Sequence, residues 1–203
     1  MTPRPRKVSD EEVFGAVHRV MSRVAPAQLT LSAIAAEAGV TAGALVQRFG
    51  SKRRLLLTLM TRVADATGEM FAGLRASHPS PLGALRSYAE CVAQMGESPG
   101  GLAHHLGYLQ MDLTDPEFHR QVRRQARAAR AEVRRLLEDA VEARELVTGT
   151  DTGRLARTVE AIVGGSLLAW AFHRDGRPSK RVCEDLDSVL APYVATRRGH
   201  PSA

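Results

Sequence analysis

The sequence contains 203 residues, of which 44% are hydrophobic and 25% are charged, and its formal net charge is +6 at pH 7. This length accommodates one well-buried domain or a small domain joined to a larger one, and the composition is too apolar for a disordered chain. No stretch approaches the ~20 uninterrupted apolar residues of a membrane span, and the first residues, "MTPRPRK", lack the apolar core of a signal peptide. We therefore expect a cytoplasmic protein with no membrane partner.

The excess positive charge lies in the first third of the chain. Residues 1–62 contain ten Lys and Arg residues against four Asp and Glu residues, whereas residues 63–203 contain 18 of each kind. Because the charges of the longer segment cancel, an acidic partner is expected to bind the N-terminal part of the protein.

Motifs of the common enzyme classes do not occur: the chain has no GxSxG sequence, Walker loop, dinucleotide fingerprint or Cys/His nucleophile pattern. Cys91 and Cys183 have no CxxC or histidine-spaced partner, so we expect buried free thiols rather than a zinc site or a disulfide. The adjacent His104 and His105 would point about 100° apart on a helix, which does not suit a shared metal ion. We therefore expect no enzyme activity, no cofactor and no metal site.

Four helices are predicted in the first third of the chain. Ser9 and Glu12 form a capping box before apolar residues at helical spacing, and Gly39 suits the left-handed conformation that closes a helix. Thr41 and Ser51 are N-cap residues for two further helices. The predicted helices run from about Asp10 to Val24, from Thr30 to Gly39, from Thr41 to Gly50 and from Lys52 to about Arg75.

The second and third helices are short and are separated by "AGVT", which is the sequence form of a helix-turn-helix. On a helical wheel of the third helix, Leu45 and Phe49 point inward together, whereas Gly43 and Gln47 point outward. Small side chains on the outward face permit close approach to base edges, and Gln47 can pair with adenine. We therefore predict that this helix enters a DNA groove, although small residues and a basic end also occur on ordinary solvent-exposed helices.

Two further groups of side chains complete this predicted surface. The methyl groups of Val46 or Ala42 can contact a thymine methyl group. Arg48 and Lys52 would lie at the rim, where phosphates pass, and the free N–H groups beside Lys52 would help to bind an anion.

The segment Leu29–Leu59, "LTLSAIAAEAGVTAGALVQRFGSKRRLLLTL", resembles the DNA-binding signature of the tetracycline-repressor (TetR) family. The resemblance covers roughly residues 9–60. It implies an all-helical, homodimeric transcription regulator, usually a repressor, whose larger C-terminal domain binds a small effector. Carried over position by position, the residues that fall where the family touches DNA are Thr30, Ser32, Thr41, Ala42, Gly43, Val46, Gln47, Arg48 and Lys52.

Two of these positions depart from the usual family pattern. Family members commonly have tyrosine where Val46 stands and histidine where Arg48 stands. Val46 cannot donate a hydrogen bond to a phosphate, whereas Arg48 keeps its charge at every physiological pH. We therefore expect affinity to depend on Arg48 and Lys52, and base discrimination to depend on Gln47.

Helices are also predicted through the rest of the chain, which makes the expected fold class all-α. Asp115 and Pro116 provide a cap and a first-turn proline for a long, arginine-rich helix, whose nearby acidic residues indicate a solvated face with ion pairs. The segment "VEAIVGGSLLAWAF" is apolar nearly all round and contains small residues. It fits core packing in part and a dimer interface better. These predicted helices span about residues 81–95, 102–113, 116–146, 151–174 and 179–197.

The expected organisation is a basic N-terminal arm (residues 1–8), a three-helix helix-turn-helix domain (9–54) and a helical effector-binding and dimerisation domain (55–203). The expected partners are a pseudo-palindromic double-stranded DNA operator, a small-molecule effector of unknown identity and a second copy of the chain. The sequence assigns no effector-binding residues. The alternative hypothesis is a helical protein-interaction adaptor that no longer reads DNA, which would show neither sequence preference nor a steep loss of DNA affinity with salt.

Overall fold

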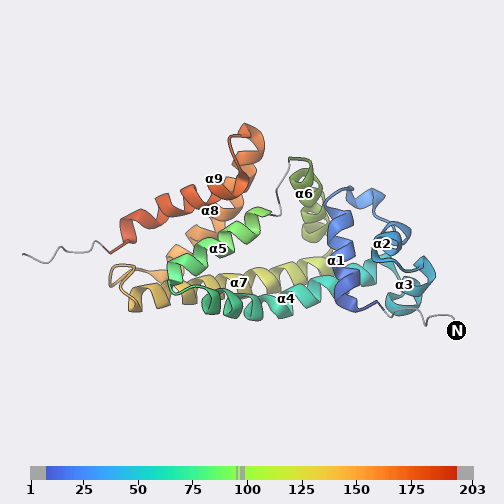
Figure 1. The fold of residues 1–203 in the computed structure, drawn as a ribbon, viewed down its shortest axis with the longest axis horizontal. Helices are drawn as coiled ribbons and strands as arrows, with labels where there is room; N and C mark the ends of the chain where they lie inside the picture. The colour runs from blue at the N-terminus through green and yellow to red at the C-terminus, as the bar shows by residue number, and fades with distance from the viewer. Residues whose placement is uncertain (1–7, 95, 97–98, 196–203) are drawn as a thin grey trace, which may run out of the picture. The chain divides into compact units, whose positions relative to one another are not determined.

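A computed structural model describes residues 8–94, 96 and 99–195 of the chain (Figure 1). The predicted all-α fold class is confirmed: these residues form no strand, and they contain one isolated β-bridge, between Leu146 and Val194. The helices are α1 (Asp10–Met21), α2 (Leu31–Ala38), α3 (Ala42–Phe49), α4 (Lys52–Ser77), α5 (Pro81–Gln94), α6 (Pro99–Thr114), α7 (Pro116–Glu142), α8 (Thr152–His173) and α9 (Pro178–Leu190), with 3₁₀ helices at Pro26–Gln28 and Ala191–Tyr193.

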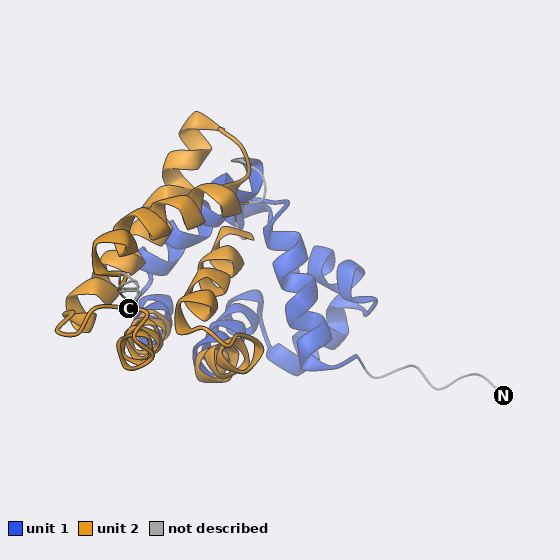
Figure 2. Ribbon diagram, turned by 60° about the vertical axis from the view of Figure 1, so that its left-hand side comes forward, with its two compact units in different colours: residues 1–65, 98–124 blue, residues 66–97, 125–203 orange. Residues whose placement is uncertain are grey.

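The chain folds into two compact units (Figure 2). Unit 1 comprises Met1–Asp65 and Ser98–Arg124, and unit 2 comprises Ala66–Glu97 and Gln125–Ala203. The long helices α4 and α7 each contribute residues to both units.

Unit 1 is built around one apolar cluster that draws on α1, α2, α3 and the first turns of α4. Tyr108 of α6 and Phe118 of α7 belong to the same cluster, so these later helices complete the core of the N-terminal segment. The Tyr108 hydroxyl donates to the carbonyl of Val24 (3.2 Å). The cluster includes Val13, Phe14, Val17, Ile34, Leu45, Leu55 and Leu59.

The predicted caps are confirmed. Ser9 accepts a hydrogen bond from Glu12 N (3.1 Å), and the Glu12 carboxylate accepts one from Ser9 N (2.7 Å), which completes the capping box of α1. Ser51 accepts from Arg54 N (3.2 Å) at the start of α4. Asp115 accepts from the backbone of the first turn of α7, at 2.9 Å from Glu117 N.

Three predicted helix ends are wrong. Helix α1 ends at Met21 rather than Val24, because Ala25, the residue before Pro26, is extended (ψ 158°) and the chain turns ahead of the 3₁₀ helix Pro26–Gln28. Helix α7 ends at Glu142 rather than Leu146, since Arg144 adopts a left-handed φ of 58°. Helix α9 ends at Leu190, short of the predicted 197, and its last turn tightens into 3₁₀ geometry at Ala191–Tyr193.

One expectation about the cysteines is also wrong. Cys183 is a buried free thiol as predicted, whereas Cys91 is exposed on α5. The inward face of α5 at this point is formed by Ala89 and Ala93. On a helix, residues two positions apart point to nearly opposite sides. Cys91 is two positions from both Ala89 and Ala93, so its side chain faces solvent.

In unit 2, α8 packs against α9 and α5, and α5 packs against α9. By length and composition, α8 resembles a membrane span, with a mean hydropathy of 1.3 over 18 residues. Its buried face, however, lies in the core of unit 2 and includes Leu155, Val159, Val163, Leu167 and Trp170. Helix α8 is therefore explained as a core helix.

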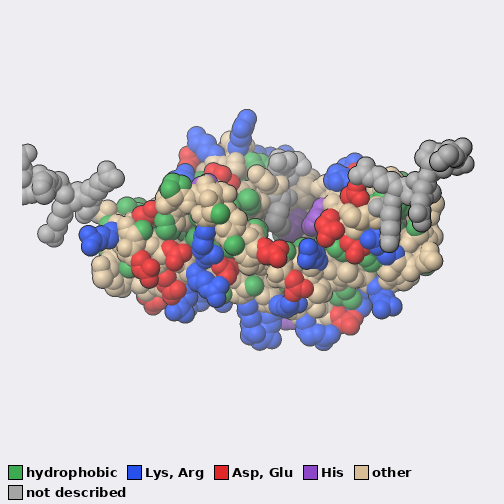
Figure 3. Space-filling view, turned by 60° about the horizontal axis from the view of Figure 1, so that its bottom comes forward, with side chains coloured by type: hydrophobic (Ala, Val, Ile, Leu, Met, Phe, Trp, Pro, Cys, Tyr) green, Lys and Arg blue, Asp and Glu red, His purple; other side chains and the backbone are tan. Residues whose placement is uncertain are grey.

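Several arginines of α7 form ion pairs, as the sequence pattern predicts. Arg130 pairs with Glu160 of α8 (2.6 Å), and Arg134 pairs with Glu138 one turn later (2.7 Å). Basic and acidic side chains are interspersed on the molecular face shown in Figure 3. This mixture is typical of a solvated helix surface rather than a second nucleic-acid surface.

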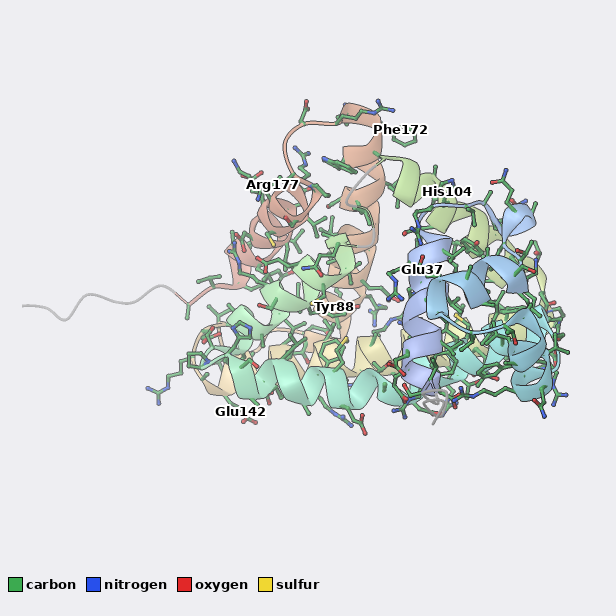
Figure 4. All side chains as sticks on the ribbon, turned by 45° about the vertical axis from the view of Figure 1, so that its right-hand side comes forward. Glu37, Tyr88, His104, Glu142, Phe172 and Arg177 are labelled. Atoms are coloured by element: carbon green, nitrogen blue, oxygen red, sulfur yellow. The ribbon has the colours of Figure 1, made fainter. Side chains whose placement is uncertain are left out.

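One acidic residue joins α1 to α2. Glu37 of α2 (labelled in Figure 4) accepts from Nε of Arg19 on α1 (2.5 Å) and from a guanidinium nitrogen of Arg23, which follows the end of α1, so that one carboxylate binds two arginines. These hydrogen bonds, from Arg19 first and Arg23 second, lower the pKa of Glu37 below its ordinary value.

Replacing this carboxylate with an amide, Glu37→Gln, is expected to lower the midpoint of thermal unfolding at pH 7 by roughly 2–4 °C. The folded-state pKa is depressed, so the stabilisation is present above the unfolded pKa and is lost as the pH falls through the folded value. Calorimetry at pH 7 and pH 3.5 measures both effects. The matched control is Glu11→Gln, which removes a single exposed pair with Arg62 (3.5 Å). An equal loss in both variants, or a loss independent of pH, would contradict the assignment.

Candidate DNA-binding surface

Helices α2 and α3 form a helix-turn-helix with a tight, glycine-closed turn. Gly39 has a φ of 70°, which lets the chain reverse at the end of α2. Val40 N then donates to the carbonyl of Ala35 (2.9 Å), so this carbonyl in the last turn of α2 has a hydrogen-bond partner. Thr41 then caps α3 by accepting from Ala44 N (3.1 Å). The turn is fixed at one end by a backbone hydrogen bond and at the other by the side-chain cap of Thr41, which sets the direction in which α3 leaves it.

Helix α3 has one fully buried side chain, and the predicted wheel is confirmed. Leu45 is 1% exposed and Phe49 is partly buried against the same core. Gly43 and Gln47 are exposed on the other side, and Val46 is 48% exposed. An exposed apolar side chain of that size, between a glycine and a glutamine, leaves a thin face that can approach another molecule closely.

The predicted threonine and serine contacts lie at the helix starts. Thr30 caps α2 by accepting from Ala33 N (3.1 Å), and Ser32 is exposed in the first turn of the same helix. Thr41 is exposed, and Ala42 is partly buried against the core. Both threonines therefore have structural roles in addition to any contact with DNA.

The two predicted rim cations are bound within the protein. Lys52 Nζ donates to the carbonyl of Leu29 (2.7 Å), which brings the start of α4 beside the start of α2. Arg48 donates to the carbonyl of Val8 (2.7 Å) and pairs with Asp10, which brings the end of α3 beside the start of α1.

The two arginines after Lys52 have different surroundings, which sequence reasoning did not distinguish. Arg53 binds Asp115 (2.8 Å) and Glu117 at the start of α7, and these hydrogen bonds, from Asp115 first, raise the pKa of Arg53. The guanidinium of Arg54 is exposed and binds no acidic or carbonyl group among the described residues. It lies near the end of α3, since a Cβ added to Gly50 would be 3.5 Å from Arg54 Nη1. Arg54 is therefore an additional candidate for phosphate binding.

Two ring nitrogens outside the helix-turn-helix lie within hydrogen-bonding distance of backbone carbonyls. His104 Nδ1 lies 3.2 Å from the carbonyl of Ser22 (Figure 4), and Trp170 Nε1 donates to the carbonyl of Gly176 (3.0 Å). Within the described residues, no three His, Cys, Asp or Glu side chains are placed to hold a metal ion.

Two of the hollows on the surface of unit 2 are lined entirely by described residues. One, of about 600 Å³, lies between the end of α5 and the start of α9, beside Gln94 and Arg177. The other, of about 470 Å³, is lined mainly by apolar atoms, with the Arg86–Asp187 ion pair (2.5 Å) at its edge. Neither hollow includes the histidines or Trp170.

Comparison with known families identifies the chain. Residues 15–59 match the family model described as "Bacterial regulatory proteins, tetR family", and residues 97–186 match the model described as "Tetracyclin repressor-like, C-terminal domain". The chain belongs to the TetR family. It is therefore a DNA-binding transcription regulator, and α2 and α3 are its helix-turn-helix. No curated protein matches the sequence significantly.

Solved structures of TetR regulators share this fold at low sequence identity. A TetR transcription regulator from Haloarcula marismortui is 16% identical, with 91% of this chain and 97% of that chain covered and a TM-score of 0.73. SmeT, the repressor of the Stenotrophomonas maltophilia multidrug efflux pump SmeDEF, is 24% identical over 97% and 96% of the chains, with a TM-score of 0.65. FadR from Bacillus subtilis, in complex with stearoyl-CoA, is 14% identical over 90% and 98%, with a TM-score of 0.66.

Removing the N-cap of the recognition helix, by Thr41→Ala, is expected to destabilise this regulator by about 0.5–2 kcal/mol, because Ala44 N loses its acceptor. Thr41→Ser keeps the hydroxyl and should retain most of the stability. The control Thr58→Ala removes an exposed hydroxyl that bonds back to Arg54 O inside α4, and it should be nearly neutral. Urea unfolding followed by circular dichroism measures all three. If Thr41→Ala were as stable as Thr58→Ala, the cap would contribute nothing.

Proposed function

We propose that this TetR regulator is a repressor that binds a pseudo-palindromic operator as a homodimer and is released by a small-molecule effector in the cytoplasm. The main support for DNA binding is the exposed face of α3, a helix that is held in place by the buried Leu45 and by the glycine-closed turn. SmeT is a repressor, and FadR binds stearoyl-CoA; both share this fold, which supports the repressor and effector parts by analogy.

The proposed DNA contacts divide into two classes. Gln47 would read base edges, with the methyl groups of Val46 and Ala42 against thymine and Gly43 allowing close approach. The threonines, Ser32, Arg48 and Lys52 would contact or orient the phosphate backbone, and the exposed Arg54 joins them. The full proposed set is Thr30, Ser32, Thr41, Ala42, Gly43, Val46, Gln47, Arg48, Lys52 and Arg54.

The proposed division of labour assigns the arm (1–8) and residues 9–54 to DNA, and residues 55–203 to effector binding and dimerisation. The arm lies outside the described residues except for Val8. An effector that prefers one arrangement of the C-terminal helices would shift α4 and change the separation of the two recognition helices. A coupling of ~1–3 kcal/mol is sufficient to change operator affinity several-fold or more.

The dimer proposal rests on the exposed face of α8. Leu168 is 40% exposed and Phe172, near the end of α8 (Figure 4), is 77% exposed. Gly164 and Gly165 lie on the same exposed side, and no heavy atom among the described residues is within 4 Å of a Cβ added to either. Among the described residues no side chain packs against these glycines, whereas they would allow a second helix to approach closely. A two-fold dimer would present two recognition helices to successive major grooves.

The proposed function is tested by selecting binding sites from a random duplex DNA pool with the purified protein at moderate salt. Enrichment of a pseudo-palindrome is the expected result. If the folded protein enriched no motif, the operator proposal would be wrong and a protein-interaction adaptor would replace it.

Base reading is tested in the same selection with Gln47→Ala. We expect the preference for adenine at one position of each half-site to disappear, since a bidentate amide contact discriminates by about 1–3 kcal/mol. The control Gln28→Ala removes an exposed glutamine outside α3 and should enrich the original motif. An unchanged motif with Gln47→Ala would remove Gln47 from the readout.

Dimerisation is tested with Leu168→Glu, which places a charge on the proposed interface. Sedimentation equilibrium at micromolar concentration should show a monomer, and operator affinity should fall at least ~10-fold because each half-site then binds alone. Val147→Glu changes a residue of similar exposure, 41%, in the loop after α7, and should remain dimeric. A dimeric Leu168→Glu variant would place the interface elsewhere.

A further inference from the structure

The last turn of the recognition helix α3 is tied to the start of α1 through Arg48. Its Nη1 donates to the carbonyl of Val8 (2.7 Å), and its Nη2 pairs with Asp10, the first residue of α1. The guanidinium carbon also lies 5.4 Å from the centre of the Phe49 ring, which packs at 6.1 Å from the Phe14 ring on α1. Two guanidinium nitrogens are therefore committed to the entry of α1, and the Arg48 side chain is 34% exposed.

Asp10 is the acidic partner in this contact. It lies in fixed surroundings, because the neighbouring Ser9 and Glu12 form the capping box of α1. Its Oδ1 atom is shielded from solvent, and among the described residues its contact with Arg48 is an ion pair rather than an aligned hydrogen bond. Removing either partner would leave the other charge partly shielded and unpaired, so the two side chains act as one link between α1 and α3.

The position of this link is important because of what surrounds it on α3. The Thr41 cap and the buried Leu45 hold the first part of the helix, whereas Arg48 directly follows Gln47, the proposed base-reading side chain. A binding side chain must be held within about 0.5 Å and 10–20° of its productive geometry. Without the link to Asp10, the last turn of α3 would keep its aromatic contact with α1 and lose this polar one.

We propose that Asp10 is a positioning residue for base reading: through Arg48 it sets the orientation of α3, so that an acidic side chain strengthens the binding of a polyanionic operator. Arg48 then contributes to affinity through the placement of Gln47 rather than through a phosphate contact of its own. This inference rests on the proposed DNA-binding function. It gives a favourable role to a carboxylate that a count of charges would place against DNA binding.

The test compares operator DNA with random-sequence DNA on the full chain, using the operator enriched from the pool. Fluorescence anisotropy at several KCl concentrations gives the affinity for an operator duplex and for a random-sequence duplex of equal length. The variants are Asp10→Ala, Arg48→Met and their combination. The matched control is Glu11→Ala, which removes an acidic side chain from the same helical turn that pairs with Arg62 (3.5 Å) rather than with α3.

The ratio of the two affinities separates positioning from stability. A variant with less folded protein loses affinity for both duplexes by the same factor, because non-specific binding also requires the folded surface. A misplaced α3 loses affinity for the operator alone, since non-specific binding uses the phosphate backbone and not the base edges. Thermal unfolding of each variant gives the folded fraction independently.

Asp10→Ala is expected to weaken operator binding ~5-fold and to leave random-sequence binding unchanged or up to ~2-fold tighter, because a negative charge is removed. Glu11→Ala should change both affinities by less than ~2-fold and preserve their ratio. Arg48→Met should weaken operator binding at least ~5-fold, with a change in salt slope below about 0.5. In the Asp10→Ala background, Arg48→Met should cost less than ~2-fold more.

Three results would overturn the positioning role. Operator binding in Asp10→Ala that is as tight as in the unaltered protein, or tighter, would show that the carboxylate only opposes the charge of DNA. A full additional loss from Arg48→Met in the Asp10→Ala background, with a salt slope lower by about 1, would indicate a direct phosphate contact. Equal losses on both duplexes would show that the ion pair serves stability alone. An unaltered protein that enriches no motif is a separate result, because it contradicts the proposed function before the variants are compared.

Discussion

An eight-residue helix has too few internal hydrogen bonds to persist alone in water, so α3 depends on tertiary packing. The Leu45 side chain supplies that packing, because it is the only fully buried residue of the helix. The Gly39 turn and the Thr41 cap fix the helix start, and the contact of Phe49 with Phe14 fixes its end. The remaining faces of α3 are therefore exposed, which is what a helix that must enter a groove requires.

The cations of the N-terminal segment fall into two groups: those bound in ion pairs within the protein and those exposed to a binding partner. Most of the described cations there are bound by the protein itself: Glu37 binds Arg19 of α1 and Arg23 just after it, and Asp115 and Glu117 bind Arg53. These ion pairs join helices within unit 1, and their carboxylates reduce the positive charge available to a partner. Within the part of the chain that the structure describes, Arg54 is exposed without such a partner. The cations counted in a segment's sequence thus outnumber those available to a binding partner. The folded structure brings carboxylates next to some of the cations and neutralises them.

Unit 2 is organised around α8, whose two faces have different environments. One face packs into the core with Leu167 and Trp170, and the opposite side leaves Leu168 and Phe172 exposed beside two glycines. A helix that is apolar on both sides is stable in water only if both sides are covered. The monomer covers one side, and the proposed dimer covers the other.

The sequence by itself determined the all-α class, the helix-turn-helix and the inward and outward residues of α3, because helical period, caps and glycine closures act over a few residues. Helix ends at α1, α7 and α9 were set by local turns that compete with helical periodicity, and sequence placed them several residues late. Only the tertiary structure decided that Arg53 pairs with residues 62 and 64 positions away, that Arg48 binds the start of the chain, and that Arg54 remains exposed. Identical side chains on adjacent positions look alike in a sequence, and their roles differ because folding brings distant carboxylates and carbonyls to one arginine and not to its neighbour.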